Sequence, residues 1–181
     1  MQSEVPMRSI LPSVSLFSAT WISASLWAVF SSGAMAHDEG NPTLDVPPVQ
    51  VTWEDPQNYR DIQAATGSQS KFEASTFKYL TQSFSKNVKR YLPDGQTLQV
   101  TVTNLDLAGE VNIPRDVRVL DHNTPPRITF TYVVKDGDNV VTQGDADLSS
   151  LGYQGKVIGL ARDRPYPYEN QMIKEWAKKT F

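Results

Sequence analysis

The sequence predicts an α+β protein: a single domain in which an antiparallel or mixed sheet of about four strands carries two helices on one face, in the order β-α-β-β-β-α. Three observations carry this prediction. Several short segments alternate apolar and polar residues, as strands do, and two longer segments repeat apolar residues every three or four positions, as helices do. A chain of 181 residues, 39% of them hydrophobic, can bury one core but is short for two domains.

The N-terminal part of the chain differs from the rest. Residues 1–36 predict a secretory signal peptide, because no acidic or basic residue lies between Arg8 and His37 and the apolar run ends in a small-x-small triplet at 34–36. The sequence is compatible with translation starting at either Met1 or Met7. An uncleaved membrane anchor is the alternative, but the serines and the cleavage triplet favour removal. Residues 37–48 are acidic and aperiodic, so we expect a flexible leader before a domain at 49–181.

The chain has no cysteine. An exported protein without cysteine has no disulfide framework and no thiol for a lipid anchor. We therefore expect a soluble periplasmic protein that is held together by its core and has no stable membrane insertion after signal cleavage.

The first two elements of the domain follow directly from residue spacing. Residues 49–53 alternate as a strand, and Pro56 ends it. Ser70 and Glu73 fit a capping box, which predicts a helix over 71–91. One apolar stripe would then consist of Phe77, Leu80, Phe84, Val88 and Tyr91.

The strand expected at 97–107 changes its apolar parity part of the way along. Leu98 and Val102 share one face, whereas Leu105 falls on the other, so we expect a β-bulge near Thr103 and Asn104. A bulge would turn the carboxylate of Asp106, the residue after Leu105, away from the core.

The remaining elements complete the sheet. Residues 127–134 and 140–148 predict two strands joined by a hairpin turn at 135–139, with a further short strand at 117–120. The last helix is expected over 168–181, with its apolar side formed by Met172, Ile173, Trp176 and Ala177.

Four blocks of this sequence, VTWEDPQNYRDI, YLPDGQTLQVTVTNLDLAG, PPRITFTY and YENQMIKEW, follow one another between Val51 and Trp176. In combination they resemble the domain of unknown function 3016 family, whose members are exported proteins of Gram-negative bacteria. The resemblance implies export and a shared fold. It implies no activity and transfers no catalytic residue.

Several function classes have little support. The net charge of −3 and the lack of any Lys/Arg run beyond a pair argue against nucleic-acid binding. No phosphate-binding glycine loop, nucleophile elbow or EF-hand spacing occurs. His37, as the first residue after cleavage, could chelate copper with His122, but nothing fixes the two side chains together. We therefore expect no cofactor and no metal.

Carboxylates offer the one catalytic alternative. A general acid and base need two carboxyl groups in one pocket with different pKa values, and the sequence supplies Asp55, Asp61, Asp106, Glu110, Asp145, Asp147 and Glu169. The pair Asp106 and Glu110, at the end of the strand at 97–107, is the candidate for a hydrolase. The structural interpretation is that Asp106 accepts backbone N–H groups at a strand end and that Glu110 is dispensable.

Aromatic and arginine side chains, which dominate protein interfaces, indicate a binding surface. The candidates form two clusters, Trp53, Tyr59 and Arg60 in the first and Arg162, Arg164, Tyr166 and Tyr168 in the second. The alternative is that Tyr166 and Pro167 pack the start of the last helix. Binding is the favoured hypothesis: a noncatalytic interaction or ligand-binding module of the cell envelope, whose partner is an envelope protein or a small ligand.

Overall fold

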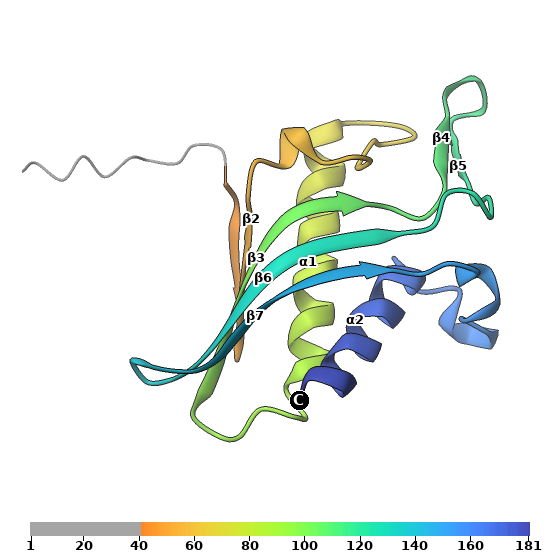
Figure 1. Ribbon diagram of the computed structural model, residues 1–181. Coiled ribbons are helices and arrows are strands. Elements are labelled where there is room, and N and C mark those ends of the chain that lie inside the picture. The colour runs from red at the N-terminus through yellow and green to blue at the C-terminus, as the bar shows by residue number, and fades with distance from the viewer. Residues whose placement is uncertain (1–40) are drawn as a thin grey trace, which may run out of the picture. The chain divides into compact units, whose positions relative to one another are not determined.

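The computed structural model describes residues 41–181 (Figure 1), so the predicted signal peptide and its cleavage site lie outside the described residues. Seven strands and two α-helices occur in the described part, in the following chain order: β1 (Thr43–Val46), β2 (Val49–Trp53), α1 (Gln69–Val88), β3 (Gln96–Asp106), β4 (Glu110–Asn112), β5 (Val117–Val119), β6 (Arg127–Asp136), β7 (Asn139–Ser149) and α2 (Pro167–Thr180). The α+β class is confirmed.

The main sheet has five strands in the order β1-β2-β3-β6-β7, one more than predicted. Its β2 and β3 are parallel and are connected through α1, whereas the other neighbours are antiparallel, so the sheet is mixed. The additional strand is β1, which lies within the expected leader and pairs along its whole length with β2. The acidic, proline-flanked sequence of β1 does not predict a strand. This segment forms one because it pairs with β2, not because of a strong pattern of its own. A separate two-stranded hairpin, β4–β5, includes the short strand predicted at 117–120.

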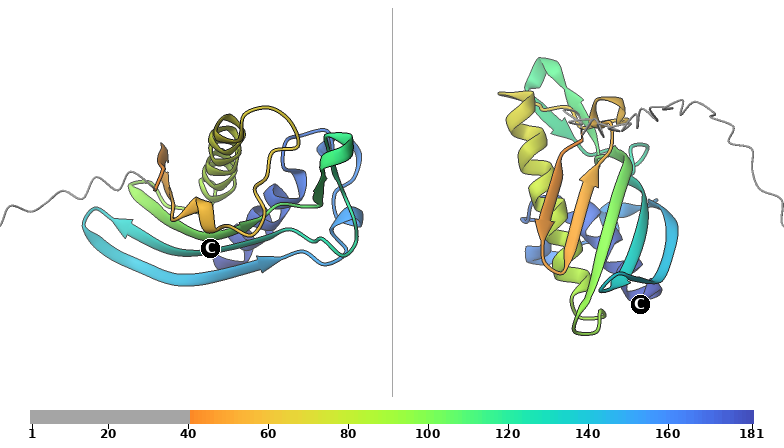
Figure 2. Two further views of the ribbon diagram at one scale, coloured as in Figure 1. Left: turned by 90° about the horizontal axis from the view of Figure 1, so that it is seen from above. Right: turned by 90° about the vertical axis from the view of Figure 1, so that its left-hand side faces the viewer.

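Both helices cover one face of the sheet, as Figure 2 shows from two directions. Apolar residues of β2, β3 and β6 point toward the helices and have almost no exposed area. On α1 the predicted stripe is buried from Phe77 to Val88, while Tyr91 lies beyond the end of the helix. On α2, Trp176 lies edge-on against Phe84 and Phe130, with ring centroids 6.0 and 4.9 Å away. These rings join the two helices to the sheet.

The start of α1 differs from the predicted capping box. The N-cap is Ser68, whose hydroxyl accepts the Lys71 N–H, and Ser70 is already helical. The Glu73 carboxylate accepts a hydrogen bond from the Gln69 side chain at 2.7 Å instead of returning to Ser70. The two-residue shift follows from the preceding loop, because the side chain of Gln69 also bonds to the backbone of that loop.

The β-bulge predicted in β3 is confirmed. The pairing register with β6 shifts between Val102 and Asn104, so that Leu105 returns to the core and is fully buried. Asp106 consequently points away from the core and is partly exposed at the end of the strand. The bulge thereby places a carboxylate at the rim of the sheet. None of the helices within 41–181 is long and apolar enough to cross a membrane.

Candidate functional site

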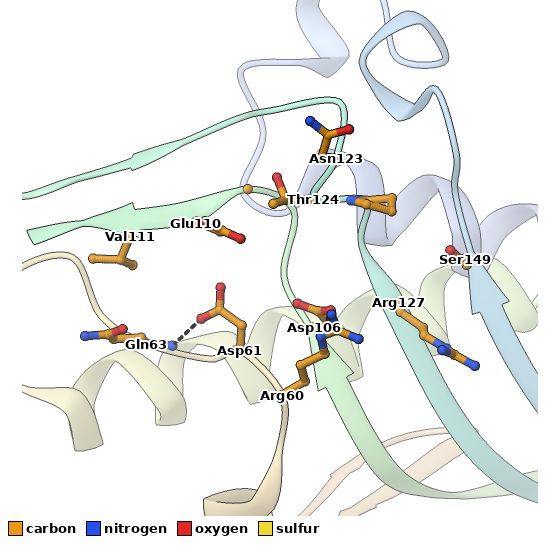
Figure 3. A pocket seen from close by; sticks show the side chains of 12 residues that line it. Arg60, Asp61, Gln63, Asp106, Glu110, Val111, Asn123, Thr124, Arg127 and Ser149 are labelled. Carbon is orange, nitrogen blue, oxygen red and sulfur yellow. Dashed lines mark hydrogen bonds and ion pairs between the residues drawn. The ribbon is translucent and has the colours of Figure 1, made fainter.

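A polar pocket of about 530 Å³ lies at the end of the sheet where β3 stops and β6 begins. Its lining, drawn in Figure 3, comes from the segment after β2, the ends of β3 and β7, the start of β4 and the loop before β6: Arg60, Asp61, Gln63, Asp106, Gly109, Glu110, Val111, Asn123, Thr124, Pro125, Arg127 and Ser149. Three carboxylates therefore face one space, and they come from three separate segments.

The backbone brings the first two carboxylates together. Beyond the end of β2 the chain pairs once more with β3, because Asp61 N–H donates to the Leu105 carbonyl at 3.2 Å and the Asp61 carbonyl accepts from Leu107 N–H at 3.0 Å. This bridge continues the parallel pairing of β2 with β3 and sets Asp61 beside Asp106.

Arg118 of β5 holds Asp61 in place. Its two terminal nitrogens donate to the two oxygens of the Asp61 carboxylate at 2.8 and 3.1 Å, a bidentate pair in which each side chain is about one-fifth exposed. The same nitrogens donate to the carbonyls of Gly109 at 2.8 Å and Gln63 at 2.9 Å. Four hydrogen bonds thus tie the β4–β5 hairpin to the segments on either side of the pocket. A bidentate pair of this kind is rigid, so this wall is formed before any ligand binds.

Asp106 has a different partner from the one expected. Within residues 41–181 its carboxylate accepts no backbone N–H, and it pairs instead with Nε of the largely exposed Arg60 at 3.1 Å. Burial raises the pKa of Asp106, with a further upward contribution from the charges of Asp61 and Glu110, while Arg60 and Arg118 act in the opposite direction. The prediction that Asp106 satisfies strand-end donors is wrong, because those donors have other acceptors. The N–H groups of Leu107 and Gly109 donate to backbone carbonyls, and the Ala108 N–H donates to the side chain of Glu169.

The remaining polar groups divide into paired and unpaired ones. Arg127 forms a bidentate pair with Asp147 of β7. Figure 3 shows that its side chain points away from Asp61 and Glu110. Glu110 is exposed, and no salt bridge to it occurs in the described part of the chain. Asn123 and Thr124 add an amide and a hydroxyl from the loop before β6. Glu110 is therefore the lining carboxylate whose charge is not balanced by an arginine.

We expect small stability effects at these two acids. Asp106→Asn and Asp106→Ala should each change the free energy of unfolding by less than about 1 kcal/mol, because the partner Arg60 is largely in solvent and regains water when the pair is lost. Glu110→Ala should change it by less than about 0.5 kcal/mol. Urea unfolding of the three variants measures this. A loss above about 2 kcal/mol at Asp106 would show that its carboxylate supports the strand end after all.

A second, apolar pocket of about 320 Å³ lies on the other side of the chain that follows β3. Its lining consists mostly of apolar and aromatic side chains with two arginines and one acid: Ala65, Phe72, Leu107, Ala108, Arg118, Leu120, Arg162, Tyr166, Pro167, Tyr168 and Glu169. The acid, Glu169 of α2, is 2% exposed, and one of its oxygens accepts the Ala108 N–H at 2.8 Å. Burial raises the pKa of Glu169 despite that hydrogen bond.

This burial predicts a pH effect on stability. Because the folded-state pKa of Glu169 lies above the unfolded-state pKa, the folded protein binds this proton more tightly, and stability is lost as the pH rises from the ordinary range of a glutamate through the raised value. Glu169→Gln does not titrate and keeps an oxygen for Ala108. We expect this variant to be more stable than the wild type at pH 8 and to lose that advantage near pH 4.

Urea unfolding at several pH values tests the prediction. Glu175→Gln, on the exposed side of the same helix, is the control and should follow the wild type at every pH. A Glu169→Gln variant that is less stable than the wild type at pH 8 would mean that the ionised carboxylate is the favoured form.

The predicted aromatic and arginine surface is not one surface. Trp53 is fully buried and stacks on Phe77 at 4.5 Å, and Tyr59 is buried with its hydroxyl bonded to the Val102 carbonyl at 2.7 Å. Both belong to the core and offer no contact area to a partner. Their neighbour Arg60 is exposed and lines the polar pocket.

The second predicted cluster is split in a similar way. Tyr168 is buried against Tyr153, with centroids 4.6 Å apart, and belongs to a small core cluster. Tyr166 and Arg162 line the apolar pocket, whereas Arg164 lies outside it, over α1. Three of the four residues of this cluster, Arg162, Tyr166 and the buried Tyr168, therefore line the apolar pocket.

Other parts of both pockets were missed. Nothing local in the sequence connects Arg118 with Asp61, because the two lie 57 positions apart and meet only through the fold. Within 41–181 no three His, Cys, Asp or Glu residues are grouped closely enough to hold a metal ion. The copper hypothesis depends on His37, which lies outside the described residues.

The fold and the two pockets define this protein as an α+β protein with two helices on one face of a five-stranded mixed sheet and cavities at one end of that sheet. The chain matches the family model described as "Protein of unknown function (DUF3016)" over residues 47–179, which is most of its length, and it belongs to this family. No curated protein and no solved structure matches it.

Proposed function

We propose that this protein is a soluble, exported and noncatalytic ligand-binding module of the cell envelope, and that its polar pocket binds a small polar ligand that is neutral or positively charged. One observation carries the proposal: the pocket has one wall held by four hydrogen bonds and one carboxylate without a salt bridge to any described residue, Glu110. Four hydrogen bonds from Arg118 hold one wall of the pocket. The negative charges of Asp61 and Asp106 are each balanced by an arginine, Arg118 and Arg60.

The size and polarity of the pocket support binding of a small molecule. Its volume of about 530 Å³ falls within the range of ligand sites in proteins. A preformed site binds more tightly because little conformational freedom is lost when the ligand enters. The carboxylate of Glu110, which has no arginine partner within residues 41–181, favours a ligand that brings hydrogen-bond donors or a positive charge.

Three sugars of similar shape but different charge test this proposal. Glucosamine, glucose and glucuronate can be titrated into ¹⁵N-labelled protein while the amide signals of residues 104–111 and of Asn123, Thr124 and Arg127 are followed by NMR. We expect glucosamine to bind most tightly, and Glu110→Gln to reduce its advantage over glucose. Asp138→Asn, in the distant β6–β7 turn, is the control and should leave binding unchanged. Tightest binding of glucuronate would contradict the proposed charge preference.

A carboxylate hydrolase remains the second candidate, and one observation favours it. The raised pKa of Asp106, in a pocket that also contains Glu110, is the arrangement that a general acid needs. Against it, Asp106 is already paired with Arg60. Release of nitrophenol from p-nitrophenyl β-glucosaminide by the wild type, with none by Asp106→Asn, would favour the hydrolase over the binding module.

Export is proposed from the N-terminal sequence and from the family resemblance. N-terminal sequencing of the protein from the periplasmic fraction should read His-Asp-Glu-Gly, the result of cleavage after Ala36. A hydrophobic segment retained in the membrane fraction would overturn this part of the proposal, while leaving the ligand-binding test unaffected.

A further inference from the structure

The apolar pocket is a second cavity, separate from the polar pocket, and its walls are also fixed. Tyr166 is held by a 2.6 Å hydrogen bond between its hydroxyl and that of Thr76 on α1. Tyr168 packs on Tyr153, whose hydroxyl donates to the Asp121 carbonyl at 2.9 Å. The aromatic part of the lining therefore needs no rearrangement to receive a ligand.

The charged groups of this pocket are not equivalent. Arg118 is neutralised by its bidentate pair with Asp61. Arg162 forms no salt bridge within residues 41–181. Its guanidinium is held by two backbone carbonyls, with Nε donating to Val157 at 2.6 Å and Nη2 to Gln154 at 2.9 Å. Arg162 is thus a positioned cation with an unbalanced charge, and its Nη1 is not used in either bond.

The acid of the pocket does not balance this cation. Glu169 is buried, forms no salt bridge in the described residues, and spends one oxygen on the backbone of Ala108. Burial raises the pKa of Glu169, so its carboxyl group ionises less readily than an exposed glutamate. The pocket also lies at the N-terminal end of α2, whose N-cap makes no side-chain hydrogen bond, and the helix dipole there favours negative charge.

We propose that the apolar pocket binds a small carboxylic acid with an apolar body: the carboxylate pairs with Arg162, and the body lies against Phe72, Leu107, Leu120 and Tyr166. The volume of about 320 Å³ is near the lower limit for ligand sites, which selects a short chain or a single ring. This proposal does not rest on the polar pocket, because the two cavities share no lining residue.

The ligand class is tested with three eight-carbon probes that differ only in the head group: octanoate, octan-1-ol and octylamine. Isothermal titration calorimetry at pH 7 with the protein after signal removal should give the tightest binding for octanoate. Arg162→Gln should weaken octanoate binding by about tenfold or more, the usual effect of losing a charge-assisted hydrogen bond. The matched control is Arg164→Gln, two residues away and outside the pocket, which should bind octanoate like the wild type.

Because Arg162 also organises its loop, a second variant keeps the test independent of that loop. Leu120 is 44% exposed at the rim, so Leu120→Asp should fold normally while placing a negative charge beside the ligand. We expect octanoate binding to weaken in this variant as well, with urea unfolding confirming that both variants are folded. Three results would overturn the proposal: no octanoate binding at millimolar concentration, tighter binding of octylamine, or octanoate binding unchanged in both variants.

Discussion

Replacing Trp176 with alanine should lower the free energy of unfolding by about 3 to 5 kcal/mol. The indole is 7% exposed and meets four aromatic rings, those of Phe84, Phe130, Tyr132 and Phe181, at centroid distances between 4.9 and 6.0 Å. Removing it would leave a cavity between α2, α1 and the sheet, and these partners come from elements that cannot all move together to fill it.

The measurement is urea unfolding followed by circular dichroism. Lys174→Ala, on the exposed side of α2, is the control and should cost less than about 0.5 kcal/mol. Trp176→Phe keeps a ring in the site and should fall between the control and Trp176→Ala. A loss below about 1 kcal/mol for Trp176→Ala would mean that α2 contributes little to the core and that its apolar face serves a partner.

Gly109→Ala should cost about 2 to 4 kcal/mol, from two causes that act together. Gly109 has a φ of +80°, which disfavours any residue with a side chain, and an added Cβ would lie 2.3 Å from the carbonyl oxygen of Val119. That oxygen belongs to the backbone of β5, which is held in place by the pairing of β5 with β4. Val119 would have to move away from Gly109, which would open the end of the β4–β5 hairpin where Val119 pairs with Glu110.

A matched control separates the two causes. Gly67 has almost the same backbone angle, φ +78°, but nothing lies within 4 Å of an added Cβ. Gly67→Ala should therefore show the conformational cost alone, about 1 to 2 kcal/mol. If both variants lose the same free energy of unfolding, the close approach to Val119 has no energetic effect. The polar pocket should also be disturbed in Gly109→Ala only, because Gly109 lies in its wall and its carbonyl accepts from Arg118.

The sequence predicted some elements of the fold correctly and missed one strand. The stripe from Phe77 to Val88, the parity change that indicated the bulge in β3, and the apolar side of α2 were all correct. Each is a local pattern, because a residue faces the core or the solvent according to the geometry of its own helix or strand. The sequence failed at β1, whose four residues are a strand only because β2 lies beside them.

The candidate sites were predicted less well, and for a related reason. Residue type alone indicated aromatic and arginine binding residues, but Trp53 and Tyr59 proved to be core residues, since large aromatic side chains serve packing as readily as binding. Glu169 appeared in the sequence only as one acid among several, whereas the structure shows it as the only buried acidic or basic side chain among residues 41–181, and burial raises its pKa.

By itself, the sequence determined the class of fold, the core faces of its main elements and the orientation of the Asp106 side chain away from the core. These features follow from the spacing of apolar residues within one segment. Only the tertiary structure decided which side chains meet. Asp61 pairs with Arg118, Asp106 with Arg60, and Arg162 stays without a counterion among residues 41–181. Such pairings depend on distances between segments far apart in the chain, and those distances are set by the packing of the helices and the β4–β5 hairpin around the sheet.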